Sequence, residues 1–206
     1  MIIQINENID LSRYDLNTPP DNWDSNLQSI QTEYANLRNM GPKNTESFYF
    51  LYDNIETTKV VAAISCMKNM ASNYFITKTT TVCPIRVLDF SSCKCLHDML
   101  DILDFLGINI YDSEMIIYGF ENLKIKSLQY HNRNTRVLQG YPELLEVSWF
   151  GQQLTDYNNG KVFKEIIANA AIEIDGYRWC ENHNPYGLTY CFFDCDKIAP
   201  PRRDYI

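Results

Sequence analysis

The sequence contains few of the residues that interrupt regular structure, and none of the features that mark several large protein classes. Only 8 of the 206 residues are Gly and 8 are Pro, so there is no low-complexity region. There is no block of Lys and Arg, and the formal net charge is −8, so we expect no nucleic-acid partner. No apolar run approaches the ~18 residues of a membrane-spanning helix, so no membrane partner is expected.

Motifs that identify several common catalytic folds are also missing. There is no G-x-S-x-G elbow, no G-x-G-x-x-G turn and no Walker loop, which argues against a Ser-His-Asp hydrolase, a Rossmann domain and a P-loop enzyme. The seven cysteines are an odd number without the spacing of a disulfide framework. Their close pairs, Cys93 with Cys95 and Cys191 with Cys195, lack the two-residue spacing of a zinc knuckle, so we expect no metal.

The N-terminus does not resemble a signal peptide, because Met1-Ile2-Ile3 is followed at once by polar and acidic residues. Together with the unpaired thiols, this leads us to expect a cytoplasmic protein, or one delivered into the cytosol of a target cell. Hydrophobic residues make up 45% of the chain, and 206 residues can bury a substantial core. We expect a single domain over 1–206, in which residues 1–22 form an irregular N-terminal segment.

Hydrophobic periodicity predicts strands and helices that alternate along the chain. Strands are predicted at 47–52, 74–82, 85–90, 177–180 and 188–193, and helices at 24–39, 55–67, 91–106, 143–150 and 161–171. Gly176 is expected to end the last helical segment in the left-handed conformation. The fold class is therefore mixed α and β.

The stretch 172–194 is the most informative, because the polar residues 181–187 separate two apolar, aromatic-rich runs. A polar loop between two buried strands can present reactive groups on a rigid support. An ordinary hairpin is the alternative interpretation.

Three segments, in order, resemble the RES domain, a family named after an arginine, a glutamate and a serine. Residues 38–49 (R-N-M-G-P-K-N-T-E-S-F-Y) followed by Glu56-Thr57 resemble its arginine, its Gly-containing turn, its Phe-Tyr strand and its Glu-Thr helix start. Residues 85–90 (I-R-V-L-D-F) resemble the strand L-x-x-L-D-L, and 175–179 (D-G-Y-R-W) resemble D-G-I-x-Y. The matches span most of residues 35–195.

The resemblance implies an α+β fold similar to ADP-ribosyltransferases, with a split β core flanked by helices, and NAD as the substrate. Characterised members are toxins of toxin–antitoxin pairs or delivered effectors. The expected function is cleavage of NAD at the nicotinamide–ribose bond, by a glycohydrolase or a phosphorylase. A protein of this kind needs a neutralising partner, an antitoxin or immunity protein.

The same resemblance assigns roles to individual residues. Arg38 falls at the family's arginine, whose planar guanidinium suits a bidentate clamp on the NAD pyrophosphate. Tyr49 falls at the strand tyrosine expected to hold the nicotinamide ring. The remaining expected substrate-binding residues are Glu56, Thr57, Asn182 and His183. Each also has an ordinary interpretation: a solvated charge, a core tyrosine, a helix first turn or a polar turn.

The sequence departs from the family at two important positions. The family's catalytic glutamate falls at Val61, four residues after Thr57, and a valine cannot stabilise a ribosyl cation. The family's serine falls near Glu181, which we assign as a substitute catalytic carboxylate. The alternatives are a catalytically degenerate RES-like domain that acts as a nucleotide-binding or protein-interaction module, and a protein ADP-ribosyltransferase.

Overall fold

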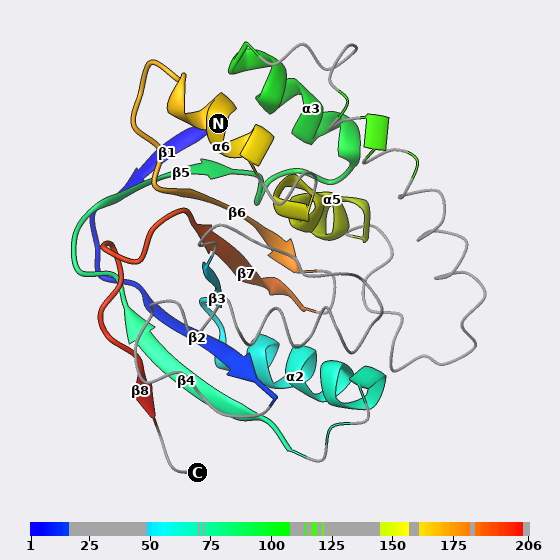
Figure 1. The fold of residues 1–206 in the computed structure, drawn as a ribbon, viewed down its shortest axis with the longest axis vertical. Helices are drawn as coiled ribbons and strands as arrows, with labels where there is room; N and C mark the ends of the chain where they lie inside the picture. Colours follow the sequence, from blue (N-terminus) through cyan, green and yellow to red (C-terminus); the bar gives the residue numbers. More distant parts are fainter. Residues whose placement is uncertain are drawn as a thin grey trace.

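The strands of the protein form one mixed sheet with helices packed against it (Figure 1). The computed structural model describes residues 1–16, 49–69, 71, 73–107, 114, 117–118, 121, 145–156, 161–181 and 184–203. Across these described ranges the sheet has eight strands in the order β1-β5-β6-β7-β3-β2-β4-β8. Neighbouring strands are antiparallel except β5 and β6, which are parallel. The fold is therefore mixed α+β.

The strands are β1 (Ile2–Ile5), β2 (Asp10–Asp15), β3 (Tyr49–Tyr52), β4 (Phe75–Thr80), β5 (Ile85–Asp89), β6 (Gly176–Glu181), β7 (Asn184–Phe192) and β8 (Arg202–Arg203). The helices are α2 (Ile55–Asn69), α3 (Leu96–Phe105), α5 (Leu145–Asp156) and α6 (Lys161–Ala168). Figure 1 shows α3, α5 and α6 gathered at the β5–β6 side of the sheet, whereas α2 runs along β2 and β3 at the other.

Local sequence signals account for most of these elements. The five predicted strands correspond to β3, β4, β5, β6 and β7, and four of the predicted helices to α2, α3, α5 and α6. α2 begins where predicted because the Asn54 side-chain oxygen accepts hydrogen bonds from the backbone N–H groups of Glu56 (2.9 Å) and Thr57 (3.2 Å). α3 is followed by Gly107, whose φ of 78° is left-handed. The predicted helix 24–39 lies outside the described residues.

The prediction that residues 1–22 are irregular is wrong for β1 and β2. β1 pairs with β5 from Ile2 opposite Leu88 to Ile5 opposite Ile85. The burial pattern of β2 does not alternate, and polar Ser12, Arg13 and Asp15 are among its buried residues. A hydrophobic pattern cannot identify such a strand, because its buried positions are not apolar.

The role predicted for Gly176 is also wrong. α6 ends at Ala168, and Gly176 is the first residue of β6, where it pairs with Val87 and Phe192. A Cβ on Gly176 would overlap the backbone carbonyl oxygen of Cys191. Glycine is therefore needed here because β6 and β7 approach closely, and not because the backbone is left-handed.

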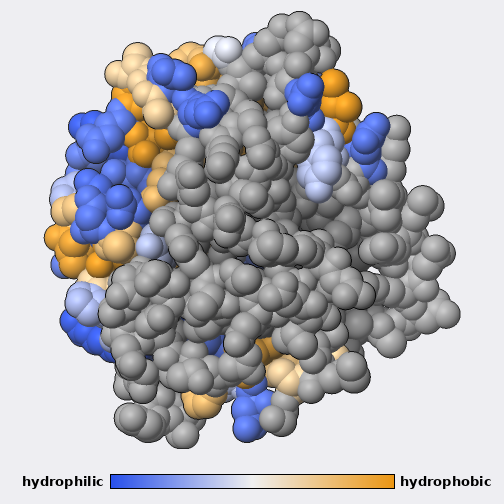
Figure 2. All heavy atoms as spheres, viewed as in Figure 1, coloured by the Kyte–Doolittle hydropathy of each residue, from blue (hydrophilic) through white to orange (hydrophobic). Residues whose placement is uncertain are grey.

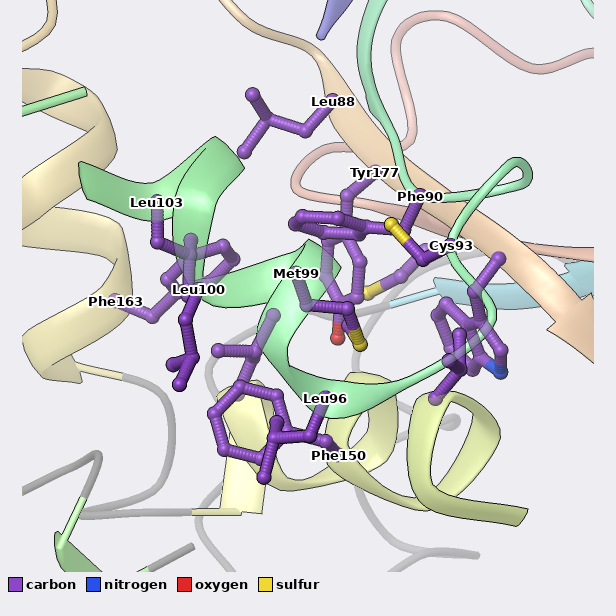
Figure 3. Packing of buried hydrophobic residues seen from close by; sticks show 14 of the residues in the cluster. Leu88, Phe90, Cys93, Leu96, Met99, Leu100, Leu103, Phe150, Phe163 and Tyr177 are labelled. Carbon is purple, nitrogen blue, oxygen red and sulfur yellow. The ribbon is translucent and has the colours of Figure 1, made fainter. Parts of the chain in front are cut away.

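The larger hydrophobic core lies between β5, β6 and the helices α3, α5 and α6. Figure 3 shows Met99 and Leu103 of α3 packing in one cluster with Phe150 of α5 and Tyr177 of β6. The rings of Tyr177 and Trp179 are stacked with centroids 5.2 Å apart. This aromatic layer fixes how α5 sits on β6.

A second core cluster covers the opposite face of the sheet. It includes Tyr49 and Leu51 of β3, Val87 of β5 and Phe192 of β7. Phe50 points the other way and meets the Trp179 ring edge-on at 6.1 Å. Both faces of the central strands are therefore buried, and the parity of a residue in its strand decides which core it joins.

The described surface mixes polar and apolar side chains. Figure 2 shows orange patches separated by blue ones along the left rim of the view. Among the side chains whose burial is described, the most exposed large apolar one is Phe105, at 82%. Within the described ranges, no helix combines the length and the apolar character needed to cross a lipid bilayer.

Candidate functional site

The Glu181 carboxylate is buried at the end of β6, where a bulge between Cys180 and Glu181 shifts the pairing with β7. Its side chain accepts a hydrogen bond at Oε1 from Ser148 Oγ of α5 (2.8 Å) and at Oε2 from Thr189 Oγ1 of β7 (3.0 Å). The residue is only 3% exposed. Glu181 is therefore part of a buried polar layer, and the ordinary interpretation of an exposed loop glutamate does not apply to it.

The first turn of α2 packs on the same part of β7. Thr57 is fully buried, and a Cβ on Gly187 would overlap its hydroxyl oxygen. Gly187 lies two residues before Thr189, which holds Glu181, and residues two apart share one face of a strand. The structure thus brings Thr57 and Glu181 to neighbouring positions along β7. Val61 lies one helical turn beyond Thr57, on the same side of α2.

Glu56, by contrast, lies on the exposed side of α2. Its side chain is 66% exposed and accepts a hydrogen bond from Lys59 Nζ at 2.7 Å. An acidic residue in the first turn of a helix is favoured by the helix dipole. The structure therefore places Glu56 in a surface ion pair rather than beside Glu181.

Tyr49 and Glu181 lie on opposite faces of the sheet. Tyr49 pairs with Phe192 and belongs to the second core, whereas Glu181 bonds to α5 on the first-core side. The tyrosine of β3 that lies on the Glu181 side is Tyr52, which pairs with Thr189. Motif matching cannot separate the two tyrosines, because only strand parity decides which one faces the carboxylate.

The hydroxyl of Tyr52 is held in its neutral form. Burial raises the pKa of Tyr52 well above its usual value, and the neighbouring Tyr14 and Glu181 act in the same direction, against the opposing effect of Arg13. The rings of Tyr14 and Tyr52 are stacked with centroids 6.4 Å apart. Tyr52 therefore offers this side of the sheet an aromatic ring and a neutral hydroxyl.

Further hydroxyls join α2 to the sheet. Ser12 Oγ of β2 lies 2.7 Å from Thr58 Oγ1, and the Thr58 hydroxyl also donates to the Asn54 carbonyl at 3.2 Å. Tyr14 donates from its hydroxyl to Ser65 Oγ at 3.1 Å. The α2–β2 contact is thus unusually polar for a buried interface. Sequence reasoning missed it, since a hydroxyl has no periodicity of its own.

A separate ionic cluster lies on the other face of β6, the side of the second core. Arg178 donates from Nε and Nη2 to the two Asp89 oxygens (2.9 and 3.0 Å) and from Nη1 to the Tyr190 hydroxyl (2.7 Å). Burial lowers the pKa of Arg178, but its bonds to Asp89 and Tyr190 outweigh burial and raise it overall. This cluster ties β5, β6 and β7 together on the side away from Glu181.

The other predicted site residues, Arg38, Asn182 and His183, lie outside the described residues. Among the residues that are described, no three His, Cys, Asp or Glu side chains group as metal ligands. The described site offers one buried carboxylate, the hydroxyl residues Ser148, Thr189, Thr57 and Tyr52, and the start of a helix.

The comparisons with known proteins identify no relative of this chain. No protein-family model matches the sequence, and no match was found among curated proteins or among solved structures.

Proposed function

We propose that this protein cleaves NAD at the nicotinamide–ribose bond, with Glu181 as the carboxylate that stabilises the developing ribosyl cation. The observation that supports the proposal is the place of Glu181. It lies at the end of β6, on the side of the sheet against which the first turn of α2 packs. The RES resemblance puts the family's serine near this position and its glutamate on the same side of α2, at Val61.

The reaction requires mainly that the protein hold a negatively charged group beside the ribose carbon from which nicotinamide departs. The bond from C1″ of the nicotinamide ribose to the nicotinamide nitrogen breaks, and its electron pair leaves with neutral nicotinamide. The positive charge then spreads over C1″ and the ring oxygen, where a fixed carboxylate stabilises it. Water or phosphate adds to C1″ and releases a proton, which gives ADP-ribose or its 1″-phosphate.

Other residues fit this proposal to different degrees. Thr57 and Tyr52 lie on the Glu181 side, and we propose that they line the pocket. Arg38 stays the predicted pyrophosphate clamp, and Asn182 and His183 stay predicted contacts to ribose or phosphate. For Tyr49 to hold the nicotinamide ring, the ring would have to reach the opposite face of the sheet.

The alternative is a nucleotide-binding or protein-interaction module without catalysis. One observation favours it: Val61 stands where the family has its glutamate. A protein ADP-ribosyltransferase is a further alternative, in which a protein side chain replaces water as the acceptor.

The deciding experiment measures nicotinamide release from NAD by the purified protein, with and without phosphate. Release without phosphate indicates a glycohydrolase, and release only with phosphate indicates a phosphorylase. Glu181→Gln should abolish either activity. Glu173→Gln is the matched control, because Glu173 is exposed. Full turnover by Glu181→Gln would show that the carboxylate assignment is wrong, and NAD binding without release would favour the binding module.

We also propose that the protein acts in a cytosol as a toxin or delivered effector and is neutralised by an antitoxin or immunity protein. Expression of the wild-type chain should then lower cellular NAD and stop growth, whereas Glu181→Gln should do neither. Unchanged NAD on expression of an active enzyme would contradict the toxin proposal.

A further inference from the structure

We infer that Ser148 and Thr189 are positioning residues, which fix the Glu181 carboxylate for the reaction proposed above; the inference rests on that proposed function. A glutamate carboxylate rotates easily about its last side-chain bond. Here each of its oxygens accepts a hydrogen bond from a different hydroxyl, at 2.8 Å from Ser148 and 3.0 Å from Thr189. Two bonds from two elements fix both the plane of the carboxylate and its position.

The Ser148 hydroxyl is itself held in place by β6. Gly151 lies three residues after Ser148, on the same side of α5. Its backbone is so close to the sheet that a Cβ would be 2.8 Å from Cδ2 of Trp179, and Tyr177 donates from its hydroxyl to the Gly151 carbonyl at 2.6 Å. Tyr177, Trp179 and Glu181 alternate along β6, so the strand that carries the carboxylate also sets the place of its donor.

The second hydroxyl stands on a central strand. Thr189 is 2% exposed and pairs with Trp179 of β6 on one side and with Tyr52 of β3 on the other. A buried residue with a strand on each side has little freedom to move. Both donors are therefore on rigid supports, as a fixed catalytic group requires.

This arrangement has a specific kinetic signature. The two hydroxyls act through Glu181, so their loss should weaken transition-state stabilisation while leaving substrate binding intact. Ser148→Ala and Thr189→Val should each lower kcat about tenfold, which is the order expected for losing a hydrogen bond to a charged group. KM for NAD should stay unchanged.

The chain offers matched controls and conservative variants. Ser65 and Thr79 are also buried hydroxyl residues: Ser65 accepts a hydrogen bond from the Tyr14 hydroxyl, and Thr79 donates one to the Ala199 carbonyl. Ser65→Ala and Thr79→Val should leave kcat unchanged. Ser148→Thr and Thr189→Ser retain a hydroxyl at each position and should recover most of the lost kcat.

The experiment measures kcat and KM from nicotinamide release for all these variants, after circular dichroism melting has shown which are folded. Ser148→Ala and Thr189→Val test the two donors independently, so either variant can test the positioning role if the other does not fold. An active wild type whose kcat is unchanged by both variants would overturn the positioning role alone. A rise in KM at constant kcat would do the same, because it would mean direct substrate contact. A wild type that releases no nicotinamide would overturn the proposed function and this role together.

Discussion

Replacing Gly176 by alanine tests the close approach of β6 and β7. The added methyl group would overlap the Cys191 carbonyl oxygen and lie 3.2 Å from the Phe192 Cα, so it meets backbone and not a movable side chain. The two strands must separate in the middle of the sheet. Overpacking of this kind costs about 3 kcal/mol. For a protein of this length, we expect the melting temperature to fall by about 6–12 °C.

Gly107→Ala is the matched comparison, because a different physical cause applies there. Gly107 has a φ of 78°, and a Cβ on it would meet nothing within 4 Å. Only backbone strain opposes the substitution, at about 1 kcal/mol. The melting temperature should therefore fall by about 2–4 °C.

Urea unfolding and thermal melting, both followed by circular dichroism, measure the two variants side by side. Gly176→Ala should lose clearly more free energy of unfolding than Gly107→Ala. An equal or smaller loss would refute the reasoning that strand separation, and not backbone conformation, makes glycine necessary at Gly176.

Three other predictions concern single contacts. Arg178→Met leaves the half-buried Asp89 unpaired and should lower the free energy of unfolding by about 2 kcal/mol at pH 7, measured in urea. Burial opposes ionisation of Asp89, but hydrogen bonds from Arg178 and Ser91 outweigh it and hold the pKa of Asp89 below its usual value. The stability from the Arg178–Asp89 pair is thus present above about pH 4 and is lost as pH falls through the pKa of Asp89 in the folded protein. If Arg178→Met kept this pH dependence, the dependence could not be assigned to the pair. Asn54→Ala removes the cap of α2 and should cost about 1 kcal/mol in the same assay, whereas Asn54→Asp should cost little; equal losses would argue against capping. Phe105→Ser should change stability by less than about 0.5 kcal/mol, since the side chain is exposed, and a larger loss would indicate contacts that its exposure does not suggest.

Most elements with an apolar period were predictable, whereas two strands were missed: β1, which is short although it is rich in isoleucine, and β2, whose buried positions are mostly polar. β5 and α3 have regular apolar positions, and their types were correct, although α3 begins at Leu96 rather than at residue 91. β2 was missed because Ser12, Arg13 and Asp15 occupy its buried positions, where their bonds to Thr58 and to each other replace apolar contacts. Such compensation becomes visible only when the partner is in place.

The candidate site shows the same division. Glu181 was predicted as a site residue from its place in the sequence, and the structure adds that it is buried and bonded to two hydroxyls. Ser148 lies 33 residues away, on a helix, and no local pattern connects the two. Thr189 could not be singled out either, because its contact with Glu181 depends on its register opposite Trp179 and Tyr52.

By itself, the sequence determined the alternation of strands and helices, the start of α2 at its asparagine cap and the acidic character of the chain. Each follows from residues near one another, because hydrophobic period, capping and turn chemistry act over a few positions. Only the tertiary structure decided that Tyr52 and not Tyr49 shares a face with Glu181, and that Gly176 serves strand packing. These features depend on strand register, and a shift of one residue would turn every side chain of a strand to its other face.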